Sequence, residues 1–525
     1  MLPAIWHRHI FLFGLIGLAG GMMFGAASTS IPQIILVCNW LLEKQFQSKW
    51  KSLKSNKVFL VLFSVYCIHI VGLLYTHNFP KAFDDLRVKI PLLLFPLILF
   101  TTKPISVKEL RLLLSLFLLS VFVSSICCFL VFKGYTHKVI IDIRKASIFM
   151  SHIRFSLFIA FAIIISCYGI ITEKNRIIKV VLIILMSWLS FIMYKLEMAS
   201  GLTFLCITVI LLILLYSMRQ FSKPIWIILL ILFFVGSGVM MREVFRSLDM
   251  YSKSPNLSSN MLLEKTKNDR PYTQDTTFGL AENGVLIAIN VNSDELRKQW
   301  KIRSAIDFEQ KDKRGNILYY TIIRYMASKG FTKDSVGISL LTQQDITNIE
   351  NGNCNYKYDL NSGLTTKWRE LIWEYTMFNR GENPSGHTLT MRVEFWKTAI
   401  YIIKHHFFFG VGTGDAQDQF NVAYVDTKSI LIPEWRLRSH NQYLAIGVAL
   451  GSLGLLIFLI SLFYPAIVLR KKLHQLYWPF FFIALLSFFT EDTLETQTGV
   501  TFFVYFNTLF LWLAYQKKSI DTNDK

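Results

Sequence analysis

The sequence predicts an all-α polytopic membrane protein with about twelve transmembrane helices and a mixed α/β domain in one long loop. Hydrophobic residues make up 53% of the 525 residues and charged residues only 17%, whereas soluble domains carry about 25% charged residues. The apolar residues, among them 44 Phe, fall in long unbroken runs, which is the pattern of membrane-spanning helices. One long polar segment, 242–391, interrupts them. This composition excludes a disordered protein, a fibrous protein and a small fold held together by disulfide bonds.

The apolar runs form two blocks. Several runs reach the roughly 20 residues that a helix needs to cross a bilayer, although a few, such as 29–42, are shorter. The C-terminal block, 440–525, has three expected spans, near 440–468, 476–490 and 498–515. The N-terminal block, 1–241, has nine, near 10–27, 29–42, 58–75, 84–102, 112–132, 147–171, 177–194, 198–216 and 224–241.

The sequence of segment 242–391 predicts a folded domain. Asn283-Gly284 and Arg314-Gly315-Asn316 are turn signals, because these residue types favour tight turns. Residues 285–291 alternate between apolar and polar, as in a strand, and residues 317–326 have a helical pattern. We therefore expect both helices and strands in this domain.

The next segment, 392–439, is amphipathic and contains Gly410-Val411-Gly412-Thr413-Gly414. Its glycines alternate, no strand precedes them and no βαβ unit surrounds them, so the motif does not fit a dinucleotide-binding fingerprint. We expect a tight turn that ends an amphipathic helix at the membrane surface.

The formal net charge of +20 would indicate nucleic acid as a partner if the protein were soluble. Here, however, Lys and Arg concentrate in alternate short loops, such as 43–57, 173–179 and 470–472. Loops rich in Lys and Arg stay in the cytoplasm. The charge therefore predicts that both termini are cytoplasmic, that segment 242–391 is outside, and that no nucleic acid is bound.

Metal and cofactor chemistry has little support. Of the seven cysteines, only Cys354 lies in a polar region, so no disulfide framework or cysteine metal site is expected. The chain has no HExxH, GxSxG or Walker motif. We predict no metal and no cofactor.

A histidine stands where the outer segment re-enters the membrane, in Arg438-Ser439-His440-Asn441-Gln442-Tyr443-Leu444. The ordinary pKa of histidine, about 6.5, suits it to accept a proton near neutral pH. The pattern alone leaves open that His440 only makes a hydrogen bond to a helix end.

Acidic and basic residues flank this position. Glu491, Asp492 and Glu495 lie between the last two spans, where they could bind a cation, position a sugar, pair with arginines or form a solvated loop. Arg154 falls inside an expected span, and such a charge usually faces a cavity or a partner. Arginine clusters suit diphosphates, although Arg392 would equally suit a lipid headgroup. Other cations near outer span ends are Arg87, Lys89, Arg144, Lys145 and Lys195.

These motifs together resemble the O-antigen ligase and polymerase superfamily. The core is Arg392 to Trp396, then Gly410 to Gly414, then His440 to Leu444 with Gly451 and Gly454 following. Further similar stretches are Asp85-Leu86-Arg87-Val88-Lys89 with Pro91, Arg324-Tyr325 with Ser328-Lys329-Gly330 and Lys333-Asp334, Asn383-Pro384-Ser385-Gly386-His387, and Glu491-Asp492 with Leu494-Glu495.

The resemblance implies a metal-independent, inverting GT-C-type glycosyltransferase in the bacterial inner membrane, with the large loop in the periplasm. Such enzymes take a glycan from undecaprenyl diphosphate. Ligases pass it to the lipid A–core oligosaccharide in lipopolysaccharide biosynthesis, polymerases to another lipid-linked repeat, and related enzymes to protein. The sequence leaves these alternatives open. A more distant alternative is a transporter of lipid-linked glycans, for which we would expect internal repeats. A membrane sensor is a further alternative.

The resemblance maps the family histidine to His440 and the family loop arginine to Arg392. We expect His440 to be the catalytic base, and Arg392, Arg438, Arg154 and Lys195 to bind diphosphate. We also expect Asn441, Glu491 and Asp492 to contact substrate. One departure concerns the diphosphate site. Many members carry a Ser-Arg pair where this chain has Ala199-Ser200-Gly201-Leu202, so Lys195 or Arg154 is expected to supply the missing charge.

Overall fold

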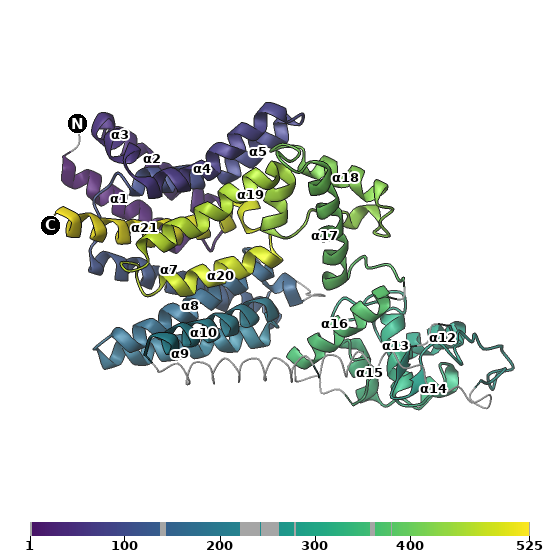
Figure 1. The fold of residues 1–525 in the computed structure, drawn as a ribbon. Helices are drawn as coiled ribbons and strands as arrows, with labels where there is room; N and C mark the ends of the chain where they lie inside the picture. The colour runs from purple at the N-terminus through teal and green to yellow at the C-terminus, as the bar shows by residue number, and fades with distance from the viewer. Residues whose placement is uncertain are drawn as a thin grey trace.

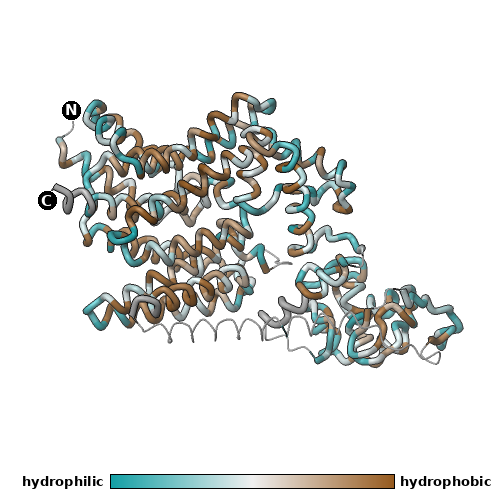
Figure 2. Tube along the Cα trace, in the orientation of Figure 1, coloured by the Kyte–Doolittle hydropathy of each residue, from teal (hydrophilic) through white to brown (hydrophobic). Residues whose placement is uncertain are grey.

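The computed structural model describes residues 3–136, 143–220, 242, 262–277, 280–357, 363–379 and 381–523. Long helices run side by side in one bundle, and both termini lie at the same end of it (Figure 1). A smaller helical domain lies beyond the opposite end, which we call the outer end. Hydrophobic residues dominate the bundle, while hydrophilic residues gather at its ends and in the domain (Figure 2). The architecture confirms an all-α polytopic membrane protein.

Seven helices of the described residues are long and apolar enough to cross a membrane. Two shorter apolar helices, α2 (Ala26–Leu42) and α20 (Tyr477–Thr490), accompany them, as does α1 (Ala4–Gly21). The expected span 224–241 lies outside the described residues, so the total of about twelve stays a prediction. The seven spans are Lys57–Tyr75 (α4, Lys57–Val71, with η1, Gly72–Tyr75), Val107–Phe132 (α7), His152–Thr172 (α8), Arg176–Lys195 (α9), Ala199–Tyr216 (in α10, Ala199–Gln220), Gln442–Leu469 (α19) and Gln497–Lys517 (in α21, Gln497–Asn523).

The expected span 84–102 is wrong as a single helix. It is divided between α5 (Phe79–Lys89) and α6 (Pro91–Leu99), which meet at Ile90. Proline lacks the N–H that would continue the helix, and the charges of α5 disfavour burial in lipid. As a result α5 lies at the outer end and carries Asp85 and Lys89 to the candidate site described below.

The bundle core is aromatic. The ring of Phe117 on α7 lies 5.0–6.3 Å from the rings of Phe158 and Phe161 on α8 and of Phe502 and Phe506 on α21. Edge-to-face and offset contacts at these separations add to the packing energy of large apolar side chains. These helices therefore form the rigid centre against which the outer-end residues are held.

Helix α19 is broken at Gly451, which has a φ of 66°. The break frees carbonyl groups that lipid cannot satisfy. Backbone after α17 (Thr388–His405) fills this role, because the N–H groups of Val411 and Gly412 donate to the carbonyls of Val448 and Ala449 at 2.9 Å. The alternating-glycine motif is thus a backbone segment paired with an interrupted membrane helix.

The glycines permit this close approach. A Cβ on Gly410, where φ is 73°, would lie 2.5 Å from backbone atoms of the residues around Leu450. The segment then continues to Asp415, whose carboxylate accepts hydrogen bonds from the N–H groups of His77 and Asn78 at 2.7–3.1 Å. The motif therefore links broken α19 to the start of α5.

The large loop folds mainly as helices. Strands β1 (Ala281–Glu282) and β2 (Val285–Leu286) form an antiparallel hairpin, and the other strand contacts among the described residues are isolated bridges. Asn283 and Gly284 both have positive φ, as a tight hairpin turn requires. The prediction of a mixed α/β domain therefore overestimated the amount of β-structure. The domain helices are α12 (Ser293–Arg303), α13 (Leu318–Ser328), α14 (Ser335–Ser339), α15 (Gln343–Glu350) and α16 (Gly363–Asn379).

The remaining short elements complete the chain. Near the termini lies α3 (Phe46–Lys54), and at the outer end lie η2 (Ile143–Ala146), α18 (Ala416–Asp426), η4 (Pro433–Trp435) and η5 (Thr493–Glu495). The last of these connects α20 to α21 and carries acidic residues of the candidate site.

The loop-domain stretch that resembles the superfamily has a structural role. Arg324 bonds the buried carboxylate of Glu282 at 2.6 and 2.8 Å, and its guanidinium lies 3.6 Å from the ring centre of Trp373. Tyr325 donates to Asp345 at 2.6 Å, and Asp334 accepts from a backbone N–H of α14. These residues hold the domain helices together.

We predict that the stability of the loop domain rises with pH between about 8 and 10.5. Burial lowers the pKa of Lys333 from 10.5 to about 8. In this window the unfolded chain holds a proton that the folded domain has lost, so unfolding becomes less favourable as pH rises, by roughly 1–3 kcal/mol. Urea titrations read by subtilisin cleavage of the loop would measure the slope. Lys333→Met should flatten it, and the exposed Lys301→Met should not. An unchanged slope in Lys333→Met would contradict the assignment.

We also predict that Gly410→Ala destabilises the bundle by about 2–4 kcal/mol, because it combines a left-handed backbone with overpacking. Thermal unfolding of the detergent-solubilised protein would measure this. The matched control is Gly20→Ala, since a Cβ on Gly20 would meet nothing within 4 Å and alanine favours helix. Equal melting temperatures for the two variants would show that the glycine segment tolerates separation from α19.

Candidate functional site

A cluster of charged side chains lies at the outer end of the bundle, and we call it the outer charged cluster. It joins the start of α8, helices α5 and α17, the segment that leads into α19 and the α20–α21 connection. Its members form three groups of ion pairs at 2.5–3.7 Å, around Glu495, Glu491 and Asp492. They are Asp85, Lys89, Arg154, Arg392, Arg438, His440, Glu491, Asp492 and Glu495.

Local backbone structure fixes His440. This residue has a φ of 45°, in the left-handed region, and a non-glycine residue there is held by its surroundings. On one side Trp396 donates from Nε1 to the Ser439 carbonyl at 3.1 Å. On the other side Asn441 caps α19 by accepting from the Leu444 N–H, and it also donates to the Phe489 carbonyl at 3.1 Å. His440 is therefore locked at the helix start.

The imidazole of His440 faces a carboxylate. Its Nδ1 is buried and lies 3.7 Å from Oδ1 of Asp492, while the side chain as a whole is 33% exposed. Burial alone would raise the pKa of Asp492, but its interaction with His440 and the nearby Arg438 hold that pKa below its usual value. An ionised Asp492 can orient the ring and stabilise its protonated form.

Glu491 lies between two arginines. Its carboxylate oxygens are 3.5 Å from Nη2 of Arg154 and 3.6 Å from Nη2 of Arg392. Burial raises the pKa of Glu491, although Arg154 opposes this, and burial lowers the pKa of Arg392, although Glu491 opposes it. These separations are longer than direct hydrogen bonds, so both guanidinium groups keep donors for another anion.

Arg154 lies within a candidate membrane span, as expected, but at the outer end of that span. Helix α8 begins at His152, after the cap Ser151, so Arg154 lies in its first turn. The predicted span 147–171 began too early because Ile148 to Met150 are apolar but form no helix. Arg154 reaches the cluster from the helix end.

A second part of the cluster centres on Glu495. Its carboxylate accepts from Lys89 at 2.9 Å, from Arg438 at 3.3 Å and from Gln442 at 3.3 Å. Lys89 also donates to Asp85 at 2.5 Å. From the sequence we named Glu495 among three acids and Lys89 among the outer cations, but we did not pair them. We gave Asp85 and Gln442 no role of their own. The sequence feature that could have identified Glu495 as a site residue is its position as a third acid, four residues after Glu491, in the connection between two apolar helices.

Lys195 does not join this cluster through any contact among the described residues. Its ammonium lies 6.0 Å from the ring of Phe191 and 5.8 Å from that of Tyr194, both on its own helix. The nearby Gly201 packs tightly on α8, since a Cβ there would lie 2.6 Å from Ser156. Arg154 is therefore better placed than Lys195 to replace the missing family arginine.

His440, Glu491 and Asp492 offer ligand atoms within 4.8 Å of one another, a spacing that a metal ion could bridge. However, both oxygens of Glu491 already face arginines. A cation would therefore meet competing positive charge from Arg154 and Arg392, whereas an anion would gain from it. The guanidinium groups of Arg154 and Arg392 therefore offer donors to an anionic ligand at this place.

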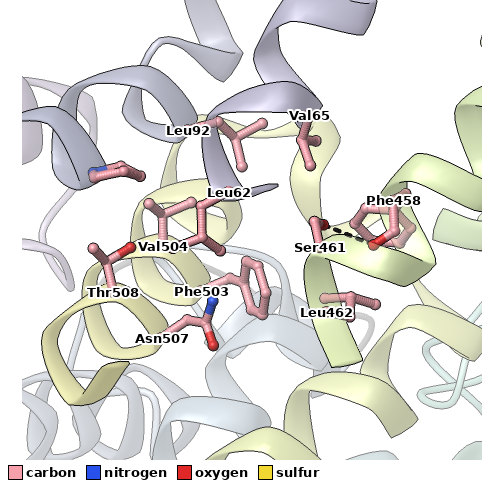
Figure 3. Close-up of a pocket in the computed structure, with 11 residues that line it drawn as sticks. Leu62, Val65, Leu92, Phe458, Ser461, Leu462, Phe503, Val504, Asn507 and Thr508 are labelled. Atoms are coloured by element: carbon pink, nitrogen blue, oxygen red, sulfur yellow. Dashed lines mark hydrogen bonds between the residues drawn. The ribbon is translucent and has the colours of Figure 1, made fainter. Parts of the chain in front are cut away.

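A separate pocket lies among α4, α6, α19 and α21 (Figure 3). Its lining is apolar except for Ser461, Asn507 and Thr508. Ser461 donates to the Phe458 carbonyl at 2.7 Å, and Oδ1 of Asn507 is buried without a hydrogen-bond partner. None of the outer charged cluster lines this pocket, so we place the candidate site at the cluster.

Comparison with protein families assigns part of the chain. Residues 361–459 match the family model described as O-Antigen ligase. This part of the chain is similar to O-antigen ligases. The match includes Arg392, the alternating glycines and His440. It confirms the resemblance to the O-antigen ligase and polymerase superfamily and the coarse class of a membrane glycosyltransferase. The search of curated proteins gives no match for this chain.

Proposed function

We propose that this protein transfers a glycan from undecaprenyl diphosphate to the lipid A–core oligosaccharide, with inversion at the anomeric carbon. The observation that carries the proposal is the pairing of His440 with Asp492 beside Arg154, Arg392 and Arg438. A base next to a group of arginines fits an acceptor hydroxyl and a diphosphate leaving group.

The cluster suits a direct displacement. His440 accepts the proton of the acceptor hydroxyl at Nε2, because Nδ1 faces Asp492. The acceptor oxygen forms a bond to the anomeric carbon while the bond from that carbon to the phosphate oxygen breaks. The diphosphate leaves with the electron pair, and Asp492 stabilises the imidazolium.

The arginines stabilise the leaving group. Arg154 and Arg392 hold donors on either side of Glu491, so diphosphate oxygens can take up these donors as charge develops. Preorganised donors of this kind are commonly worth several kcal/mol in the transition state. The activated donor itself supplies the driving force, so the proposal needs no nucleotide.

The proposed location is the bacterial inner membrane, with both termini in the cytoplasm and the outer end in the periplasm. Both termini lie at one end of the bundle, and α5 and α17, which carry cluster residues, lie at the other (Figure 1). The Lys- and Arg-rich loops of the sequence support this orientation. The lipid-linked donor then reaches the cluster from the outer leaflet.

Gel electrophoresis of surface glycolipids from a deletion strain tests the acceptor. Loss of long glycan from the lipid A–core, with lipid-linked polymer still accumulating, supports the ligase. A single repeat unit on the core would instead identify a polymerase. Unchanged lipopolysaccharide together with unglycosylated protein would identify a protein glycosyltransferase. Accumulation of the donor on the inner face of the membrane would identify a transporter.

His440→Ala should lower glycan transfer from a lipid diphosphate donor by at least about 100-fold, the usual range for loss of a general base. Transfer by the purified protein would measure this. His405→Ala is the matched control, because this exposed histidine lies at the end of α17. Transfer near the wild-type rate by a folded His440→Ala protein would refute the base assignment.

Arg392→Ala should weaken donor use more than acceptor use, by about 10- to 100-fold in kcat/KM, because it removes a guanidinium from the diphosphate site. Steady-state kinetics with each substrate varied in turn would separate the two effects. Arg392→Lys should restore little if a planar fork is needed, and the exposed Arg87→Ala should have no effect. Complete recovery by lysine would indicate that only a point charge matters.

A further inference from the structure

Glu495 is buried where four segments of the chain meet. It lies in η5, and its side chain is only 8% exposed. Its carboxylate bonds Lys89 of α5, Arg438 of the segment before α19 and Gln442 of the first turn of α19. A buried carboxylate with three side-chain donors constrains all of them at once.

Glu495 is shared between two cations, Lys89 and Arg438. Lys89 is 3% exposed and also faces Glu495, so the carboxylate has a second cation. Burial raises the pKa of Asp85, which shares Lys89, despite the lysine. Glu495 stays charged, since Lys89 and Arg438 outweigh burial and hold its pKa far below the usual range. The ionised carboxylate of Glu495 therefore holds Lys89 and Arg438 together at one point.

The hydrogen bond to Glu495 uses only one edge of the arginine. A guanidinium has five N–H donors in a rigid fork, and here Nη1 bonds the carboxylate while the side chain stays 29% exposed. Arg438 precedes His440 by two residues, and Asp492 lies near enough to act on its charge. Fixing this edge orients the remaining donors next to the reacting groups.

We propose that Glu495 is a positioning residue that, together with Lys89, holds the Arg438 guanidinium in place to bind the diphosphate of the donor. This inference rests on the proposed function. Glu495 acts through Arg438 and Gln442 and does not touch the substrate. The ligand class is a diphosphate monoester or diester, for which inorganic pyrophosphate is the simplest probe.

The Glu495→Gln variant distinguishes a positioning role of Glu495 from a purely electrostatic effect of its charge. The substitution removes a negative charge near an anion site, so a purely electrostatic effect would tighten pyrophosphate binding. If Glu495 positions Arg438, the variant should bind pyrophosphate about tenfold more weakly and lose a similar factor in kcat/KM for the donor, because small misplacements of a binding group are costly. Calorimetry and transfer kinetics on the full-length protein measure both. The control is Glu434→Gln, at an exposed carboxylate of the same outer segment.

A double-mutant comparison tests the route through Arg438. In an Arg438→Ala background, Glu495→Gln should change pyrophosphate binding and donor kcat/KM by less than about twofold, because residues that act as a unit are not additive. Unchanged or tighter pyrophosphate binding in Glu495→Gln, or a full additional loss in the Arg438→Ala background, would overturn the proposal.

If Glu495→Gln fails to fold, Glu495→Asp keeps the charge but shortens the reach, and the same weakening is expected from it. Wild-type behaviour of a folded Glu495→Asp would overturn the inference. The proposed function is checked separately: wild-type protein that transfers no glycan from any lipid diphosphate refutes the function itself, whereas active wild-type protein with an unaffected Glu495→Gln variant refutes only the positioning role.

Discussion

The neutralisation of buried carboxylates at the outer end of the helices is the interaction on which the site depends. Glu491 and Glu495 are removed from water, and an unpaired buried charge would be strongly destabilising. Each is matched by two cations, Arg154 and Arg392 for the first, Lys89 and Arg438 for the second. Because these cations come from distant parts of the chain, pairing brings α5, α8, α17 and the start of α19 to one place.

Backbone packing supports this arrangement. The break in α19 at Gly451 and the glycine segment after α17 satisfy each other's hydrogen bonds, which irregular backbone at membrane depth requires. The same segment ends at Asp415, which holds the start of α5. The helix that carries Lys89 and the helix that follows His440 are thus joined through one stretch of main chain. Loss of a single glycine would therefore reach the chemistry indirectly.

The large loop is a separate structural unit with its own core. Arg324, Glu282 and Trp373 form a buried ionic and aromatic contact, and Arg314 approaches Glu197 of the bundle at 3.8 Å. The superfamily-like residues in this domain are therefore explained by folding. The outer charged cluster, in contrast, combines buried charge, a strained histidine backbone and arginines with free donors, features that folding alone does not require.

The sequence by itself determined the membrane class, the outer segment and the candidate roles of Arg392 and His440, because apolar runs and local motifs depend on residues close together in the chain. It misjudged the span 84–102, where Pro91 and the charges of α5 divide one apolar run. Only the tertiary structure decided which charges meet. Glu495 is two residues from the nearest span but more than 400 residues from Lys89 in sequence, and no local pattern specifies so distant a pairing.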